Sequence, residues 1–537
     1  MVRFLTFALV ATSLLFGTAS ATQAAAGDLD PSFGTGGLVT TDFESRDDFG
    51  VGAALQSDGK IVVAGNSGVF SPFNIDFALA RYNPDGSLDS TFGNGGKVSS
   101  DFGTSVDAAS DVVVQADGKL VAGGLSGFNF AVARYNPDGS LDTSFGVGGV
   151  TTTDFGGSEQ VNAVILQADG KIVAAGYTLP SGLPGDFALA RYNPDGSLDT
   201  TFGTAGKVTT DLGSFDLGFD AEATGDGKIV VSGRNGDNFA LARYDANGAL
   251  DPTFGTGGKV TTDLGGSDQA QGLTIDAAGR VVATGPSSGD FALVRYNLDG
   301  SLDSGFGAGG IVKTDFSGGS PDTAFDVVVD GNGRITVAGG SSPAPGSAHF
   351  ALARYDSAGN LDLSFGSGGK VTTAFPSPAS NALDLLAQSD GKVVAIGGTR
   401  DLTVSGSGDF ALARYLGTPT TTKVVIDVKP ESDENVIPLE SGGVVPVAIL
   451  TTDSFDATTV DPATVCFGDA EDPSGRDCTT KHGEAEVVDV SADGRPDLLL
   501  HYEVAETGID PGDTQACLTG RTRTGGAIEG CDRVLTR

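Results

Sequence analysis

The chain has 537 residues, with 69 Asp and Glu against 32 Lys and Arg, which gives a formal net charge of −37 at pH 7. Phosphate binding needs clustered Lys and Arg, so this charge argues against nucleic acid as a partner and against anionic membrane surfaces. It suits a soluble extracellular protein, and the length allows more than one domain.

Residues 1–26 are expected to be a secretory signal peptide. Arg3 precedes an apolar stretch from Phe4 to Phe16, and small residues follow at 19–21 and 24–26, an order typical of export signals. An uncleaved anchor is the alternative, but the stretch is shorter than the roughly 20 residues of a membrane span. We therefore expect a secreted protein, extracellular or periplasmic, without membrane insertion.

Residues 27–416 contain seven copies of one motif, clearest in the run D-F-A-L-A-R-Y-N-P-D-G-S-L-D-T-T-F-G from Asp186 to Gly203. Three markers agree on seven copies: the tyrosine, the leucine of L-D-x-x-F-G and a basic residue after a turn. The tyrosines are Tyr82, Tyr135, Tyr192, Tyr244, Tyr296, Tyr355 and Tyr415. The leucines are Leu29, Leu88, Leu141, Leu198, Leu250, Leu302 and Leu361. The basic residues are Lys60, Lys119, Lys171, Lys228, Arg280, Arg334 and Lys392. A repeat of about 55 residues is a supersecondary module that must stack on its neighbours.

Each repeat is expected to form three to four antiparallel strands. Its segments are short and rich in Val, Ile, Phe and Tyr, and D-G and N-P-D-G turns separate them. The runs 61–64 and 77–80 are apolar throughout, so they should be covered on both sides. Small sheets arranged radially meet this need, which predicts a seven-bladed β-propeller. A β-helix is the less favoured alternative, because its rungs are shorter and need no D-G hairpins.

The two ends of the repeat region are complementary fragments of one unit. The region begins with the L-D-x-x-F-G element at Leu29 and stops after Tyr415. Joining the fragments would close the ring and remove both exposed sheet edges.

Polar residues that recur in every repeat are interpreted mainly as scaffold. The arginine before each tyrosine, such as Arg81, is expected to cross its hairpin to the aspartate of L-D, such as Asp89, in a partly buried pair; an anion site is the alternative. The loop from Asn83 to Asp89 is spaced like a calcium loop, but Arg81 would hold its first ligand position, so a Pro-Asp-Gly turn is favoured.

The residue before the phenylalanine of each A-R-Y strand could form a polar ring at one end of the propeller. These residues are Asp76, Asn129, Asp186, Asn238, Asp290, His349 and Asp409. Such a ring could bind a ligand, but solvated strand ends are the favoured interpretation.

A second, β-rich domain is expected at residues 423–537, after a short linker at 417–422. It holds all four cysteines, Cys466, Cys478, Cys517 and Cys531, which predict two disulfides in a secreted chain. Three connectivities are open, and local pairs, Cys466 with Cys478 and Cys517 with Cys531, are favoured. A zinc site is disfavoured because no C-x-x-C spacing occurs.

The run D-V-S-A-D-G-R-P-D in this domain resembles a calcium-binding loop. Asp489, Ser491, Asp493 and Asp497 occupy positions 1, 3, 5 and 9, Gly494 allows the turn, and the Arg495 carbonyl falls at position 7. Leu500 occupies position 12, where an EF-hand has glutamate, so a shorter loop on a β scaffold is expected. Calcium (Ca²⁺) is the predicted cofactor, and a plain acidic turn is the alternative.

The repeats resemble the delta-60 repeat of large secreted or surface bacterial proteins, through F-A-L-A-R-Y-N-x-D-G-x-L-D-x-x-F-G-x-G-G-x-V. Residues 423–537 are similar to a domain appended to many secreted bacterial proteins, through Ile426–Pro430, Gly443–Thr452 and Glu506–Thr514. The resemblance implies an exported propeller followed by a small β-sandwich-like domain, and it brings no catalytic residues.

The expected function is non-enzymatic adhesion or scaffolding, with an extracellular polysaccharide or a surface protein as partner. Only three histidines occur; His482 and His501 stand apart in the second domain, so no Ser-His-Asp site can be assembled. A metal at His482 and Glu484 is disfavoured against a solvated loop. An extracellular propeller hydrolase or lyase acting on a polymer, with its site at the channel mouth, is the alternative.

Overall fold

The computed structural model describes residues 25–537 except 44–45, 71–72, 183, 317, 319–320, 345, 402–403, 405, 418–421, 431, 433, 440–442, 453–454, 471–484 and 524–526. Residues 1–24, which hold most of the expected signal peptide, lie outside it. No helix in the described part is long and apolar enough to cross a membrane.

The repeat region forms seven four-stranded antiparallel sheets, which we number as blades 1 to 7. Blade 1 is β2 (Asp47–Leu55), β3 (Ile61–Phe70), β4 (Phe73–Tyr82) and β5 (Lys97–Ser100). Blade 2 is β6 (Asp107–Val114), β7 (Leu120–Ser126), β8 (Asn129–Tyr135) and β9 (Val150–Thr153). Blade 3 is β10 (Gly157–Leu166), β11 (Ile172–Pro180), β12 (Asp186–Tyr192) and β13 (Lys207–Thr210). Blade 4 is β14 (Asp216–Ala223), β15 (Ile229–Asn235), β16 (Asn238–Tyr244) and β17 (Lys259–Thr262).

Blade 5 is β18 (Gly272–Ile275), β19 (Val281–Ser287), β20 (Asp290–Tyr296) and β21 (Ile311–Thr314). Blade 6 is β22 (Asp322–Val329), β23 (Ile335–Ser341), β24 (His349–Tyr355) and β25 (Lys370–Thr373). Blade 7 is β26 (Ala379–Ala387), β27 (Val393–Arg400), β28 (Asp409–Tyr415) and, from the start of the chain, β1 (Leu38–Thr41). The predicted seven-bladed propeller is confirmed, with four strands in every blade.

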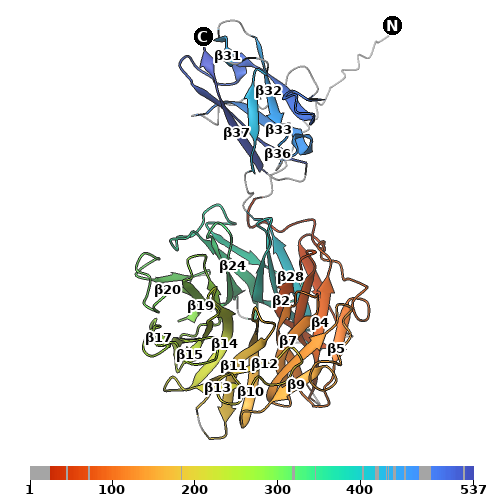
Figure 1. Ribbon diagram of the computed structural model, residues 1–537, viewed down its shortest axis with the longest axis vertical. Coiled ribbons are helices and arrows are strands. Elements are labelled where there is room, and N and C mark those ends of the chain that lie inside the picture. Colours follow the sequence, from red (N-terminus) through yellow and green to blue (C-terminus); the bar gives the residue numbers. More distant parts are fainter. Residues whose placement is uncertain are drawn as a thin grey trace, which may run out of the picture.

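The ring closes through the N-terminal strand. β1 pairs antiparallel with β28 in the register Leu38 to Ala413, and Leu29 bridges Tyr415. The first strand of each blade contacts the first strands of both neighbours, β2 with β26 included, and Figure 1 shows β2 beside β28. The N-terminal segment thus supplies the outer strand that blade 7 lacks.

The hydrophobic core lies between adjacent blades. One cluster joins Val62 and Phe77 of blade 1 to Val112 and Tyr135 of blade 2, and all are at most 1% exposed. The middle strands are buried on both faces because a neighbouring blade covers each side. This explains their unbroken apolar runs.

The C-terminal domain is a β-sandwich of two four-stranded sheets around its own core, separate from the propeller in Figure 1. One sheet is β29 (Thr422–Lys423), β37 (Ala527–Arg533), β36 (Gln515–Thr522) and β33 (Val460–Asp469). The other is β30 (Val425–Val428), β32 (Val444–Leu450), β35 (Asp497–Glu503) and β34 (Glu486–Val488). β31 (Val436–Ile437) pairs with β38 (Leu535–Thr536), and two 3-10 turns, η2 (Ala457–Thr459) and η4 (Val504–Glu506), complete the elements. β29 begins at Thr422, the last residue of the expected linker.

Candidate functional sites

The propeller has two faces with different loops. The turn face carries the turns after each first strand, five of which read D-G, and the loops after the third strands of blades 1 to 6, three of which contain N-P-D-G. The junction face carries the tips between second and third strands and the loops that lead from one blade to the next. The strand order places these loops at opposite ends of every blade.

On the turn face, the expected arginine–aspartate pairs form as predicted. Arg81 Nε donates to Asp89 Oδ2 at 2.9 Å, the Arg81 guanidinium carbon lies 4.6 Å from the centre of the Phe92 ring, and Arg81 Nη1 donates to the Pro137 carbonyl of the next blade at 2.5 Å. In the closing blade, Arg414 Nε pairs with Asp30 Oδ2 at 2.9 Å. The network joins successive blades, so its role is structural.

The loop with calcium-like spacing on this face is a turn, as favoured. The Asp85 Oδ1 atom accepts bonds from the Ser87 amide at 2.9 Å and the Ser87 hydroxyl at 2.6 Å. The side chain therefore closes its own turn.

The central channel is lined by the first strands. Six of these strands contain a β-bulge, for example between Ala109 and Asp111 in β6. A bulge leaves an amide outside the ladder that must find another acceptor. Aspartates after the bulges provide it: Asp111 accepts from its neighbour Val112 and from Val164 of the next blade, each at 2.7 Å.

Four aspartates serve the channel amides of all seven blades. Asp220 binds the amides of Ala221 and Leu273, both at 2.7 Å. Asp326 Oδ2 and Asp384 Oδ1 both bind the Leu385 amide, at 2.9 and 2.6 Å, and Asp384 Oδ2 binds the Ala53 amide at 2.5 Å. Asp326 also accepts from Val327. Because one aspartate can serve two blades, the equivalent positions in blades 1, 3 and 5 hold Gly52, Ala163 and Gly272.

Burial raises the pKa of these carboxyls, to about 8 for Asp111 and about 6 for Asp220, while the amide hydrogen bonds oppose the rise. Burial and the charge of Asp384 raise the pKa of Asp326, and the two carboxyls share a hydrogen bond. The channel cavity has a volume of about 250 Å³, and its lining contains no His, Lys, Arg or Cys side chain. Its acids are tied to the backbone, so it has few groups left for catalysis.

On the junction face, the residues of the predicted polar ring meet carboxylates from two other segments. Asp186, at the start of β12, lies with Asp211, after β13, and with Asp216, at the start of β14 in the next blade. Asp76 is only 8% exposed, so the expectation of solvated strand ends is wrong for it. Packing of the next blade covers this strand end.

The C-terminal loop has protein partners for its acids. Asp497 is fully buried and accepts from the amides of Thr451, Val490 and Ser491 at 2.7 to 3.0 Å. Asp489 accepts from the amides of Asp493 and Gly494 at 3.1 and 2.9 Å, and Asp493 Oδ1 accepts from the Arg495 amide at 2.9 Å. Among the described residues, none of the groups of three carboxylates close enough to share a metal ion includes a residue of this loop. Calcium binding here stays a prediction.

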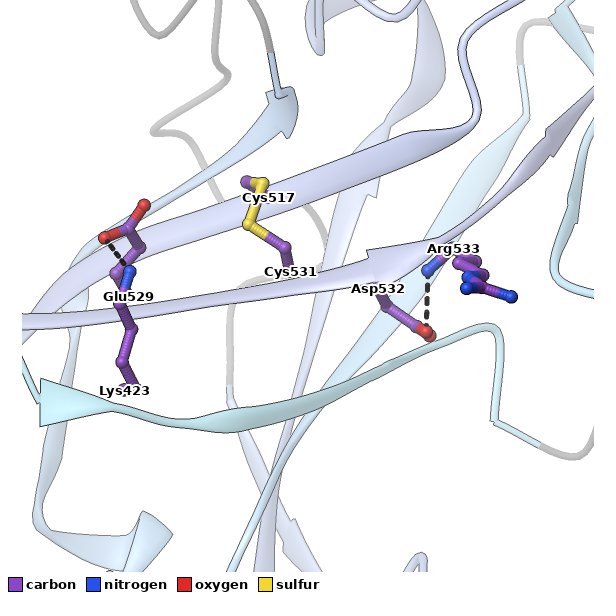
Figure 2. The surroundings of a disulfide bond; sticks show 6 residues. All are labelled: Lys423, Cys517, Glu529, Cys531, Asp532 and Arg533. Carbon is purple, nitrogen blue, oxygen red and sulfur yellow. Dashed lines mark hydrogen bonds and ion pairs between the residues drawn. A yellow bond between two sulfur atoms is a disulfide. The ribbon is translucent and has the colours of Figure 1, made fainter.

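A disulfide joins Cys517 of β36 to Cys531 of β37, directly opposite in the sheet (Figure 2). In the same view, Lys423 Nζ donates to Glu529 Oε2 at 2.7 Å. Cys466 is also disulfide-bonded, whereas Cys478, its expected partner, lies outside the described residues. His482 and Glu484 lie outside them too.

The sequence analysis did not identify the channel aspartates. Of the three carboxylates that meet on the junction face, it identified only the one in the polar ring, such as Asp186, and missed the other two, such as Asp211 and Asp216. The available signal was periodicity. An aspartate follows T-T at Asp42, Asp154, Asp211 and Asp263, S-S at Asp101 and K-T at Asp315. An acidic residue also recurs at the start of the first strand, at Asp48, Asp107, Glu159, Asp216, Asp268 and Asp322.

Seven segments of the chain match the family model described as a domain of unknown function (DUF5122) beta-propeller. They are residues 56–92, 115–145, 167–202, 224–254, 279–306, 331–365 and 388–417. These matches support a repeat propeller with one repeat per blade. No curated protein matches the sequence.

Solved structures with a similar fold come from several functional classes. A catalytically inactive virginiamycin B lyase from Staphylococcus aureus is 9% identical with a TM-score of 0.44, covering 70% of this chain and 98% of the lyase. A gluconolactonase from Xanthomonas campestris is 17% identical with a TM-score of 0.33, covering 59% and 89%. Drosophila Plexin A, solved with Semaphorin 1b, is 10% identical with a TM-score of 0.38, covering 73% and 88%. Likenesses this distant carry no information on what this chain binds or does.

Proposed function

We propose that this protein is a secreted, non-enzymatic binding protein that holds an extracellular polysaccharide on its junction face, in an adhesive or scaffolding role. The observation that carries the proposal is the contrast between the two faces of the propeller. The copies share one turn geometry and loop length on the turn face, whereas on the junction face their loops differ in length. Variable loops on a rigid scaffold are the usual carriers of ligand specificity.

The turn face repeats one geometry. Each turn after a first strand closes with an amide-to-carbonyl bond of the same kind, such as Gln56 to Lys60 at 2.8 Å in a D-G turn and Asp276 to Arg280 at 3.0 Å in an A-G turn. On the junction face, blades 2, 4 and 5 have two-residue tips between their second and third strands, whereas blades 3, 6 and 7 have the longer segments 181–185, 342–348 and 401–408. Among the described residues, the differences in loop length therefore lie on the junction face.

Among the described residues, the exposed phenylalanine side chains stand on the junction face, whereas the exposed apolar residues of the turn face, Val147, Leu298 and Leu363, are aliphatic. Phe128 and Phe215 are 56% and 39% exposed, and Val404 in another junction-face loop and Val69 near the end of β3 are also exposed. Phenylalanine rings can stack on the apolar face of a sugar ring, while nearby carboxylates and amides accept or donate hydrogen bonds to its hydroxyls. The net charge of −37 favours a neutral polysaccharide over an anionic one.

The test is retention of the mature full-length protein on a panel of extracellular polysaccharides and cell-wall preparations, with parallel assays for cleavage. We expect retention without cleavage, and a severalfold loss of retention in Phe128→Ser/Phe215→Ser. The matched control is Leu363→Ser, which removes a 75% exposed apolar side chain from the turn face and should bind like the parent. Equal retention of all three proteins would overturn the assignment to the junction face. Retention by the protein components of the cell-wall preparations, with none on any polysaccharide, would show that the ligand is a surface protein and not a polysaccharide.

An extracellular polymer hydrolase or lyase is the second candidate. The observation that favours it is the hydrogen-bonded Asp326 and Asp384 pair in the channel, because two carboxyls with different proton affinities can serve as acid and base. Both residues also hold the Leu385 amide, which weakens this reading. Cleavage of any polymer that is lost in Asp326→Asn would favour the enzyme.

The proposal includes a calcium-stabilised C-terminal module, with the loop of Asp489, Ser491, Asp493, Arg495 and Asp497 as the site. Its support is the order of oxygen ligands along the loop and the exposed position of Asp489 and Asp493. Because Asp497 is already bound by three amides, the exposed residues would contribute most of the calcium-dependent stability.

A further inference from the structure

Among the described residues, three carboxylates converge at four of the seven junctions between blades. At each junction, one comes from the third strand of a blade, one from the loop after its outer strand, and one from the first strand of the next blade. One carboxylate oxygen of each residue lies within 4.8 Å of one oxygen of each other member. The four groups are Asp409, Asp42 and Asp48; Asp76, Asp101 and Asp107; Asp186, Asp211 and Asp216; and Asp290, Asp315 and Asp322.

Buried oxygens in these groups lack a hydrogen-bond donor. Asp216 is fully buried; its Oδ2 atom accepts from the Leu212 amide at 2.5 Å, and its Oδ1 atom has no partner. Asp48, also fully buried, has the same arrangement, with Oδ2 bound to the Phe43 amide at 2.6 Å and Oδ1 unpaired. In a third group the unpaired atom is Asp76 Oδ1, whereas Asp76 Oδ2 already forms an ion pair with Arg46 at 3.4 Å. A buried carboxylate oxygen without a partner destabilises the fold unless something supplies positive charge.

The surrounding charges add to this imbalance. The charged side chains that act most strongly on Asp216 are Asp211 and Asp186, both acidic, and burial together with these charges raises the pKa of Asp216. Burial and Asp211 likewise raise the pKa of Asp186. Asp211 is exposed, so an ion from solvent can reach the group.

The remaining junctions form an internal comparison. Two of them have Asn in place of the third-strand aspartate: one consists of Asn129, Asp154 and Glu159, and the other of Asn238, Asp263 and Asp268. Here again a buried carboxylate oxygen has no hydrogen-bond partner, Glu159 Oε2 in the first and Asp268 Oδ1 in the second. At the junction of blades 6 and 7, all three acids are replaced together, by His349, Ala374 and Ser380. Joint loss of three residues that are distant in the chain indicates that they act as one unit.

We propose that the acidic junctions are divalent cation sites that join neighbouring blades, and that calcium is the ion they bind. All the side-chain ligands are oxygens, several are carboxylates, and no Cys contributes, which matches a hard cation. The ion would supply the missing partner of the buried oxygens and cancel the repulsion between the carboxylates. The sites at junctions with three aspartates should be the strongest, and the junction of His349 should have none. This inference does not depend on the proposed ligand.

The test compares the full-length protein with Asp216→Asn by calcium titration and thermal melting. Asparagine keeps an oxygen for the Leu212 amide, and its NH₂ group can donate to Asp186 or Asp211, so the substitution removes charge with little change of shape. We expect the number of calcium ions bound per chain to fall by one. Both proteins keep the C-terminal loop, so any calcium bound there contributes equally to both and does not affect the difference in the number of ions bound.

The difference in melting temperature between Asp216→Asn and the parent should change sign when calcium is added. In chelator, Asp216→Asn should melt at the same temperature as the parent or higher, because it relieves like-charge repulsion; in millimolar calcium it should melt lower. The control is Ser380→Ala, at the junction without acids, which should leave the calcium stoichiometry unchanged. An Asp216→Asn protein that binds as much calcium as the parent, or that is less stable by the same amount in chelator and in calcium, would overturn the proposal.

Discussion

At the scale of single residues, this protein uses aspartate in four distinct surroundings. In the turns it closes its own loop, as Asp85 does with Ser87. Beside arginine it forms a buried ion pair, as Asp89 does with Arg81. In the channel it binds backbone amides, and at the junctions it meets other carboxylates. Burial alone does not set its behaviour: the pKa of Asp89 falls to about 2 despite desolvation, because Thr91, Arg81 and Lys60 together outweigh it.

We predict that Asp199→Asn destabilises the propeller by roughly 3 kcal/mol at pH 7, since it leaves the buried Arg191 without its countercharge. The Thr201 hydroxyl, helped by the Thr201 amide, Lys171 and Arg191, holds the pKa of Asp199 well below its ordinary value. A lowered pKa stabilises the fold above the unfolded-state pKa of about 3.9, and this stability is lost as the pH falls further.

Thermal melting at pH 7 and pH 3 checks this prediction. The difference in melting temperature between the parent and Asp199→Asn should be largest at pH 7 and smaller at pH 3. Asp195→Asn, in the exposed turn of the same repeat, should melt like the parent. A difference that is constant or larger at pH 3 would contradict the ion-pair explanation.

At the scale of elements, the ring depends on one short strand from the far end of the chain. β1 completes blade 7, and its flanking residues Phe33 and Phe43 pack in the core between blades 7 and 1. Asp30 supplies the only L-D carboxylate that reaches Arg414 among the described ion pairs. Removing this segment therefore exposes a sheet edge, an apolar surface and a buried cation at once.

Deletion of residues 27–43 should lower the melting temperature of the whole propeller in one cooperative step. Burial of each phenylalanine alone contributes about 1.5 to 3 kcal/mol. Differential scanning calorimetry measures the effect, and adding a synthetic peptide of residues 27–43 should restore part of the loss. A propeller transition that the deletion does not change would contradict closure by β1.

In the C-terminal loop, two aspartates should respond differently to substitution. Asp497→Asn should destabilise residues 422–537 by about 2 kcal/mol with or without calcium, because a buried acceptor of three amides is weakened. Asp493→Ala should remove only a calcium-induced rise in melting temperature. If millimolar calcium does not raise the melting temperature of this domain in the parent, the loop is an acidic turn.

At the scale of the whole molecule, the two domains rely on different means of stabilisation. The propeller has no cysteine between residues 27 and 416, and its stability comes from packing between blades and from ring closure. The small sandwich has a disulfide in its sheet, as expected where a small core contributes limited stability. Their unfolding should therefore be separable.

Reduction with dithiothreitol should lower the melting temperature of the C-terminal transition and leave the propeller transition in place. Cys531 is exposed, and opening a loop of 14 residues removes roughly 3 kcal/mol in the chain-entropy picture. Calorimetry in the presence and absence of the reductant makes the comparison, and Asp199→Asn should shift the other transition only. A shift of both transitions by the same amount would show that the domains unfold together.

The sequence by itself determined the number of repeats, the β-strand content, the ring and the Arg81 and Asp89 pair. These features depend on local periodicity and on residues close together in the chain, and both are visible in a linear pattern. The acidic junctions and the amide-binding aspartates of the channel were decided by the tertiary structure alone. Asp186 and Asp216 lie in different blades, and Asp111 accepts a hydrogen bond from the Val164 amide of a neighbouring repeat. Their chemistry arises only when blades pack side by side and bring distant carboxylates, or a carboxylate and an unpaired amide, into contact.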